Sequence, residues 1–74
     1  MSRHIIIDPA APMASLRAAA GITKAEMARA RGVTAPTIDS SEAAGAGVRL
    51  STLLEAVEAV GARIEIHLVT KERP

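Results

Sequence analysis

The side chains of this chain that could carry acid–base or metal chemistry are few and far apart. Its histidines, His4 and His67, stand near opposite ends of the sequence, and there is no cysteine. Structural metal sites draw on closely spaced cysteine and histidine pairs, so these two histidines make a poor site. Gly45-Ala46-Gly47 lacks the strand, helix and lysine that accompany a phosphate-binding loop. We therefore expect no catalytic residue, no metal, no cofactor and no enzymatic activity.

The composition restricts which macromolecules the chain could bind. There is no Phe, Tyr or Trp, and the formal net charge is only +1. Without aromatic rings the chain lacks the stacking platforms that single-strand binders use. Duplex DNA remains open to it, because groove readout depends on hydrogen bonds and methyl contacts.

The length favours a single domain that associates with a partner. A chain of 74 residues buries only about 60% of the surface that it exposes when unfolded. Disulfides are excluded by the lack of cysteine, so oligomerisation is the expected source of extra stability. No apolar run approaches the roughly 18 residues of a membrane span, and Asp8-Pro9 ends the run Ile5–Ile7 too early for a signal peptide. We expect a cytoplasmic protein with no membrane contact.

The hydrophobic pattern predicts four short helices. The first covers about 12–20 and the third about 34–43, with Thr34 as a candidate N-cap. The second opens at a capping box formed by Thr23 and Glu26 and ends at Gly32. Leucines and valines at helical spacing predict the fourth helix, from about Leu50 to Val60, with Thr52 and Glu55 as a further capping-box candidate.

An amphipathic strand is expected after the helices. Polar residues alternate there with three apolar ones, which predicts a half-buried strand. A lone strand leaves an unpaired edge, so its partner is either Ile5–Ile7, of the same or another chain, or the same strand of a second protomer. Each choice favours a homodimer, and we place its interface at Ile64, Ile66 and Leu68. The expected divisions are an arm 1–11, a helical DNA-binding core 12–61, a dimerisation strand 62–69 and a tail 70–74.

The segment Gly21–Glu42 resembles the core of the Cro/Xre helix-turn-helix family, and the likeness extends over roughly 12–69. The resemblance implies a mainly α, lambda repressor-like bundle that binds double-stranded DNA. The positions that carry it are Ile22, Thr23, Glu26, Met27, Ala28, Gly32, Val33, Thr34, Thr37, Ile38 and Glu42.

The resemblance also implies which residues contact DNA. The positions that read base edges in the family correspond here to Ala35, Pro36, Thr37 and Ser40. Helix N-termini and cations near the motif supply the phosphate candidates. These are Thr23, Lys24, Arg29, Arg31, Thr34 and Arg49.

Departures from the family pattern fall at these same places. None of the base-edge positions is Arg, Lys, Asn or Gln, so no bidentate contact to a purine is available. Asp39 adds a negative charge nearby. Arg31 stands where the family usually has Leu, so its guanidinium must reach solvent or a phosphate. We expect modest direct readout, with DNA shape and half-site spacing supplying much of the specificity.

The sequence therefore predicts a dimeric transcriptional regulator, a repressor. The resemblance further implies that such a small member with a C-terminal strand serves as the autoregulating antitoxin of a toxin protein partner. The alternative is a protein-interaction module on a helix-turn-helix scaffold with weak or no DNA binding. A small hydrolase or metal protein is the third and least favoured reading.

Overall fold

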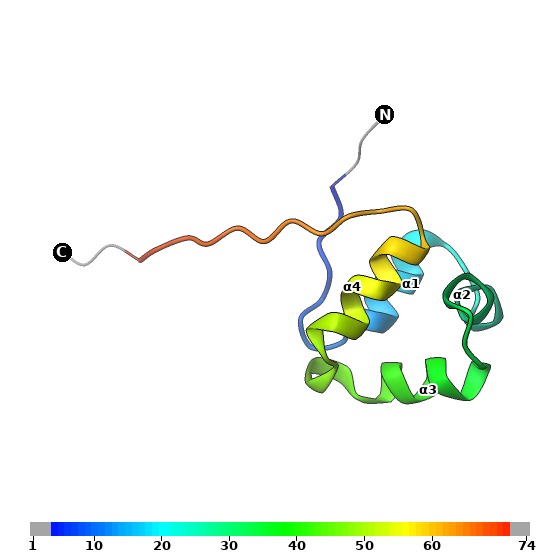
Figure 1. Cartoon of the computed structure of the whole chain (residues 1–74). Coiled ribbons are helices and arrows are strands. Elements are labelled where there is room, and N and C mark those ends of the chain that lie inside the picture. Colours follow the sequence, from blue (N-terminus) through cyan, green and yellow to red (C-terminus); the bar gives the residue numbers. More distant parts are fainter. Residues whose placement is uncertain (1–3, 72–74) are drawn as a thin grey trace.

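Four helices form the body of the protein. The computed structural model describes residues 4–71, so the outermost three residues of the predicted arm and of the predicted tail lie outside it. The elements are α1 (Pro12–Ala20), α2 (Lys24–Arg31), α3 (Ala35–Ala43), the 3₁₀ turn η1 (Gly45–Gly47) and α4 (Leu50–Ala59), arranged as in Figure 1. The predicted mainly helical architecture is confirmed.

The turns on either side of α2 explain why the helices end where the sequence predicts. Gly21 and Gly32 follow α1 and α2 with φ of 70° and 68°. This left-handed conformation costs a residue with a Cβ roughly 1–2 kcal/mol. At the other end of α1, Pro12 occupies the first turn, where its missing amide hydrogen has no helical partner to lose. Local backbone chemistry therefore sets these boundaries.

The capping box at the start of α2 is confirmed. The Glu26 amide donates to Thr23 Oγ1 (3.1 Å), and the Thr23 amide donates to Glu26 Oε1 (2.8 Å). The hydrogen bond from the Thr23 backbone, and after it the interaction with the Thr23 side chain, lower the pKa of the Glu26 carboxyl. The helix thus begins with its own carboxylate at the positive end of its dipole.

Two other predicted caps differ from expectation. Thr34 has the extended backbone of an N-cap, but its hydroxyl pairs with that of Thr37 (3.0 Å) and caps no amide. Helix α4 begins at Leu50 after Arg49, without a side-chain cap. Thr52 is therefore already helical, and a residue inside the helix cannot adopt the extended conformation that a capping box requires.

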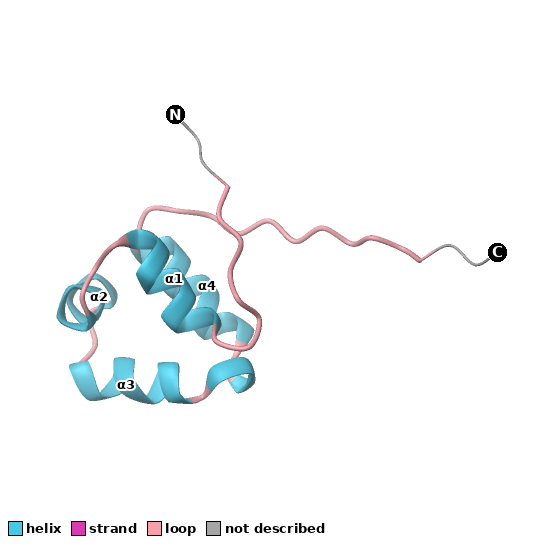
Figure 2. Cartoon of the chain, turned by 180° about the vertical axis from the view of Figure 1, so that it is seen from behind, coloured by secondary structure: helices cyan, strands magenta, loops and turns pink. Residues whose placement is uncertain are grey.

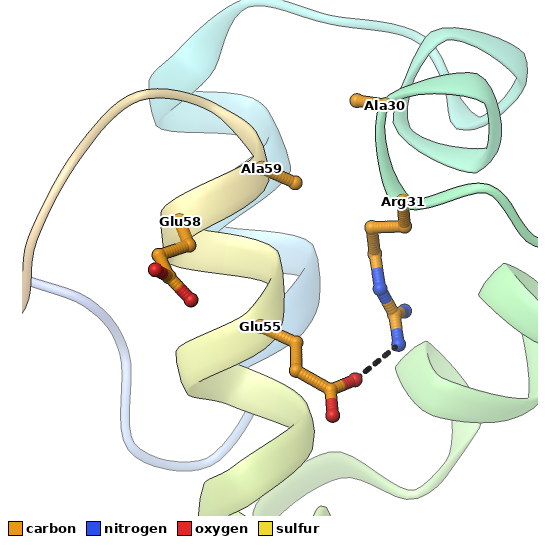
Figure 3. A pocket seen from close by; sticks show the side chains of 5 residues that line it. All are labelled: Ala30, Arg31, Glu55, Glu58 and Ala59. Carbon is orange, nitrogen blue, oxygen red and sulfur yellow. Dashed lines mark ion pairs between the residues drawn. The ribbon is translucent and has the colours of Figure 1, made fainter.

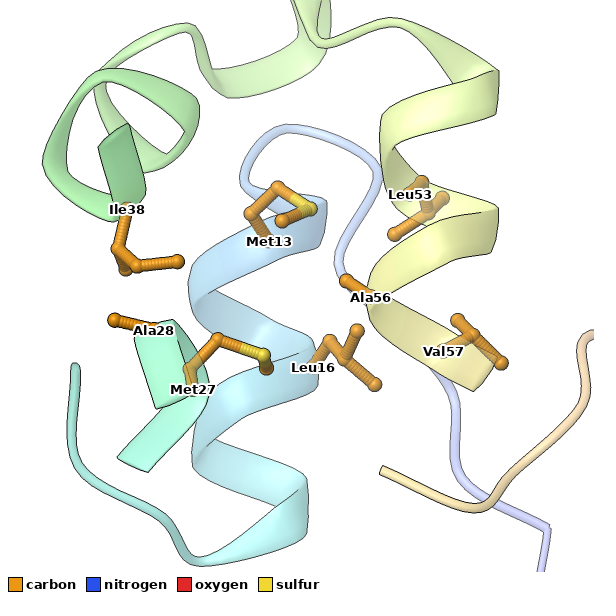
Figure 4. Close-up of a cluster of buried hydrophobic side chains, with 8 residues drawn as sticks. All are labelled: Met13, Leu16, Met27, Ala28, Ile38, Leu53, Ala56 and Val57. Carbon is orange, nitrogen blue, oxygen red and sulfur yellow. The ribbon is translucent and has the colours of Figure 1, made fainter. Parts of the chain in front are cut away.

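Eight apolar side chains from all four helices form the core, and Figure 4 shows them as sticks. Met27 and Ile38 are the most deeply buried large side chains, each 1% exposed, and Ala56 lets α4 approach closely. The set is Met13, Leu16, Met27, Ala28, Ile38, Leu53, Ala56 and Val57. Ile38 is the single buried residue of α3, so it anchors that helix to the others.

An ion pair fixes α3 against α1. Arg17 Nε and Nη2 donate to the two carboxylate oxygens of Glu42 at 2.7 and 3.1 Å, and Arg17 Nη1 donates to the Ile22 carbonyl at 3.3 Å. Both side chains are largely buried, and the hydrogen bond to Glu42 raises the pKa of Arg17. A two-pronged contact of this kind restrains direction as well as distance. It holds α3 in one orientation.

The predicted C-terminal strand is not formed in the single chain. After the Ala62 amide bonds the Val57 carbonyl, the described part of the chain has no backbone hydrogen bond in 63–71. The segment leads away from the helices, and Figure 2 shows neither it nor the Ile5–Ile7 arm as a strand. Ile64 packs against the core, whereas Ile66 and Leu68 are 75% and 89% exposed. A strand needs a hydrogen-bonded neighbour, and one copy of the chain supplies none here.

Candidate functional site

The outward side of α3 carries three of the four residues predicted to read base edges. With about 100° between successive helical residues, Pro36 and Ser40 lie opposite the buried Ile38, flanked by Thr37 and Asp39. Ala35 belongs to the same first turn, and all of these except Ile38 are exposed. We call this surface the α3 face, defined by Ala35, Pro36, Thr37, Asp39 and Ser40.

The α3 face is shallow and carries few strong polar groups. Its hydroxyls belong to Thr37 and Ser40, and that of Thr37 is already paired with Thr34. Pro36 has no amide hydrogen, and the Thr37 amide donates to the Thr34 carbonyl (3.1 Å). Small side chains of this kind allow close approach of another surface, and their methyl and methylene groups suit apolar contact such as a thymine methyl.

A salt bridge joins the α3 face to the start of α2. Lys24 Nζ lies 2.7 Å from Asp39 Oδ1, and both side chains are about half exposed. The hydrogen bond to Asp39 raises the pKa of Lys24, so the ammonium stays charged. The predicted phosphate contact Lys24 is thus beside the α3 face, but a neighbouring carboxylate neutralises it.

The remaining predicted phosphate contacts are distributed unevenly. Thr23 lies beside Lys24, and its hydroxyl is used by the capping box. Thr34 directly precedes the α3 face. Arg29 and Arg49 are exposed, on α2 and at the residue before α4.

Arg31 departs from its predicted role. Its side chain is only 7% exposed and lies between α2 and α4, where Nη2 is 3.8 Å from Glu55 Oε2. The other terminal nitrogen, Nη1, is buried without a hydrogen-bond partner. Figure 3 shows the guanidinium at a hollow of about 350 Å³ that Glu55, Glu58, Ala30 and Ala59 also line. In this position the guanidinium is mostly buried beside Glu55.

Glu65 lies beside polar side chains from both ends of the described chain. His4 Nε2 and His67 Nε2 lie 3.9 and 3.4 Å from Glu65 Oε2, and Arg63 Nη2 lies 3.2 Å from Glu65 Oε1. The alternation of Arg63, Glu65 and His67 along an extended segment was the available signal, whereas nothing in the sequence marked His4. Within residues 4–71, no three potential ligands gather as a metal ion would require.

Comparison with known proteins gives no relative: no protein-family model, curated protein or solved structure matches the chain significantly. The family expected from the resemblance therefore stays a prediction. In the described part of the chain, the helices are too short or too polar to cross a membrane.

Proposed function

We propose that the protein is a dimeric DNA-binding transcriptional regulator that inserts α3 into the major groove of each half-site. The observation that carries the proposal is the exposed stripe of small side chains on α3. Ile38 and the Arg17–Glu42 pair hold this helix rigidly with Pro36 and Ser40 outward. A helix presented in this way can approach base edges closely, and α2 lies across its side, as in helix-turn-helix proteins.

The chemistry of the α3 face supports weak reading of individual bases. Thr37 and Ser40 can exchange hydrogen bonds with either base type, and Ala35 and the Thr37 methyl can contact thymine methyl groups. Because Lys24 is paired with Asp39, phosphate attraction at this face is also reduced. A monomer of this kind would bind poorly, so the proposal requires two copies on half-sites about one helical turn, or 34 Å, apart.

The exposed C-terminal segment supports the dimer. Ile66, Leu68 and Val69 are 75%, 89% and 84% exposed, and the backbone around them has free hydrogen-bonding groups in the described chain. Pairing this edge with its copy would bury apolar surface and satisfy those groups together. In the proposal, Ile64, Ile66 and Leu68 form the apolar side of an intermolecular sheet.

A second candidate function is a protein-interaction module without DNA binding. The Lys24–Asp39 pair and the lack of Arg, Lys, Asn or Gln at the base-edge positions favour it. The toxin partner and autorepression that the resemblance implies stay predictions. Salt distinguishes the two functions, because phosphate neutralisation releases counterions and protein capture through apolar contacts does not.

The test is a fluorescence-anisotropy titration against the DNA immediately upstream of the gene, with scrambled DNA beside it, at low and moderate salt. The proposal predicts saturable binding to the upstream DNA that weakens as salt rises. Ser40→Glu, which places a carboxylate on the outward stripe, should abolish the preference for that DNA. Ala18→Glu is the matched control, because it changes the charge equally at an exposed site on α1.

Two results would contradict the proposal. Absence of binding to any duplex at low salt would remove DNA as the partner and favour the interaction module. If Ser40→Glu and Ala18→Glu lose equal affinity for the upstream DNA, overall charge, and not insertion of α3, governs binding.

A further inference from the structure

A groove lies between the ends of the helices and the terminal segments. Its apolar lining includes Ile5 from the arm, Leu16 and Ala20 from α1, Val57 from α4 and Val60 just after α4. Its polar lining is His4, Arg63, Glu65 and His67. It has a volume of about 1380 Å³ and is open to solvent. Ile64 also lines this groove and packs against the core. Among the apolar residues of segment 63–69, Ile64 is therefore the one that turns toward the helices.

The same chain cannot fill this groove with the rest of its tail. The arm and the tail meet where His4 approaches Glu65, and the tail then continues away from the helices (Figure 1). In an extended segment alternate residues share a side, so Ile66 and Leu68 face the same way as Ile64 but lie beyond the body. The molecule measures 51 Å along its longest axis as a result. A tail from a second copy, running the opposite way, could return these side chains to the groove.

Charge and hydrophobicity select one pairing register for two antiparallel copies. If Glu65 faced its own copy, two carboxylates would repel, and if His67 did so, Arg63 would face Lys71. If Ile64 faced its own copy, Leu68 would face Val60, which caps α4 and lies outside the extended segment. If Ile66 faces its own copy, each Ile64 faces Leu68 and each Glu65 faces His67. In this last register Ile64, Ile66 and Leu68 are all paired with apolar residues, Val69 faces Arg63, and an imidazole N–H can donate to each carboxylate.

We propose that segments 63–69 of two copies pair antiparallel with Ile66 on the two-fold axis, and that Leu68 of each enters the groove of the other beside Ile64. The inference rests on the proposed dimer and adds its register and its docking site. Opposed residues in such a ladder lie about 5 Å apart, so the side chain of Leu68 falls within reach of the apolar lining around Ile64. The occupant of the groove is thus the tail of a second copy of the chain.

The test is oxidative crosslinking of single-cysteine variants of the full chain, which is clean because the protein has no cysteine of its own. Disulfides need Cα atoms within about 7 Å. Ile66→Cys should therefore convert to a covalent homodimer on a non-reducing gel, whereas Ile64→Cys and Leu68→Cys should each stay monomeric alone. Mixing those two variants should yield the crosslink. Ala25→Cys, exposed on α2, gives the collision background.

A second pair of cysteine variants, at Glu65 and His67, leaves Ile64, Ile66 and Leu68 unchanged. Glu65→Cys mixed with His67→Cys should crosslink more completely than either variant alone. Self-crosslinking of Glu65→Cys, His67→Cys or Ile64→Cys ahead of Ile66→Cys would overturn the register while leaving a dimer in place. If the tail variants crosslink no faster than Ala25→Cys while the wild-type chain sediments as a dimer, the tail pairing alone would be overturned. A wild-type chain that sediments as a monomer at every concentration would overturn both the inference and the proposed dimer.

Discussion

Asp39 is a negatively charged residue on a surface proposed to meet phosphates. Its carboxylate holds the Lys24 ammonium at 2.7 Å, so one cation is neutralised before DNA arrives. Exposed ion pairs contribute little to stability, which makes a purely structural role a weak explanation for this pair. On the proposed function, Asp39 lowers sequence-independent affinity and leaves contacts on the α3 face to decide where the protein binds.

Asp39→Asn should therefore raise affinity for duplex DNA and steepen its salt dependence. Release of Lys24 adds about one phosphate contact, so the slope of log K against log salt should grow by about 0.9. Anisotropy titrations at several salt concentrations measure it. Glu58→Gln, exposed on α4 and away from the α3 face, makes the same charge change. Identical slopes for the two variants would mean that Asp39 acts only through net charge.

Glu26 should make the stability of the fold depend on pH. Hydrogen bonds from Thr23 lower the pKa of Glu26 in the folded protein from the ordinary value of 4.5. A lowered folded pKa means that the stabilisation is complete above 4.5 and is lost as the pH falls through the lower folded value. Urea unfolding between neutral and acid pH measures the loss. Glu26→Gln keeps a capping side chain without the charge, so its stability should fall less over that window; parallel curves would contradict this cause.

Among the residues that local chemistry governs, Thr23 and Glu26 were predicted correctly. Thr23 and Glu26 bond to each other within one turn, so their spacing was enough to predict the capping box. Arg31 was misjudged because its position depends on α4, which follows it by some twenty residues in the chain. The exposure of Pro36 and Ser40 followed from the helix period once Ile38 was identified as apolar. Their contact with DNA has no such local signal.

At the level of elements, the contact between α2 and α4 contains a buried side-chain donor without a hydrogen-bond partner. Arg31 is buried there with Nη1 unpaired and Nη2 at the long distance of 3.8 Å from Glu55. A buried donor without a partner costs about 1–3 kcal/mol. The neighbouring hollow, lined also by Glu58, Ala30 and Ala59, lies open to solvent at this contact.

Arg31→Leu should therefore stabilise the protein by about 1 kcal/mol or more, because it removes the unpaired donor and keeps an apolar stem. Urea unfolding with an unchanged m-value measures the gain. Arg29→Leu, on the exposed side of the same helix, should change stability by less than about 0.5 kcal/mol. A loss of stability in Arg31→Leu would show that the contact with Glu55 outweighs the unpaired nitrogen.

The helix boundaries were predictable because the residues that set them act locally. Pro12, Gly21 and Gly32 act through their own backbones, and α1 and α2 begin and end beside them. The capping box expected at Thr52 was wrong because Val48 and Arg49 have the extended backbone and α4 starts after them. The alternation in 63–68 predicted a strand, but the structure forms none, since no backbone hydrogen bond joins 63–71 to another segment of the described chain.

At the level of the whole molecule, a core of eight apolar side chains supports 74 residues. Three of the most exposed apolar residues, Ile66, Leu68 and Val69, follow one another at the C-terminal end. A small body with an apolar tail gains stability when tails associate, and the gain then depends on concentration.

The melting temperature should rise by about 4 °C for each tenfold increase in protein concentration, if two chains unfold together. Far-ultraviolet circular dichroism measures it, because the chain has no aromatic residues for fluorescence. Leu68→Asp should melt at a lower temperature that does not vary with concentration. A wild-type melting temperature that is constant over a hundredfold range would contradict dimerisation through the tail.

The buried methionines make the rate of oxidation a measure of how often the fold opens. Met13 and Met27 are 3% and 1% exposed, so peroxide cannot reach either thioether while the helices stay closed. Oxidation must wait for transient opening, and its rate counts how often the body opens. Each sulfoxide formed is polar and cannot return to an apolar site without cost. Methionine sulfoxide therefore forms at the rate of transient opening, and each sulfoxide then raises that rate. The lifetime of the folded chain thus depends on the oxidant concentration.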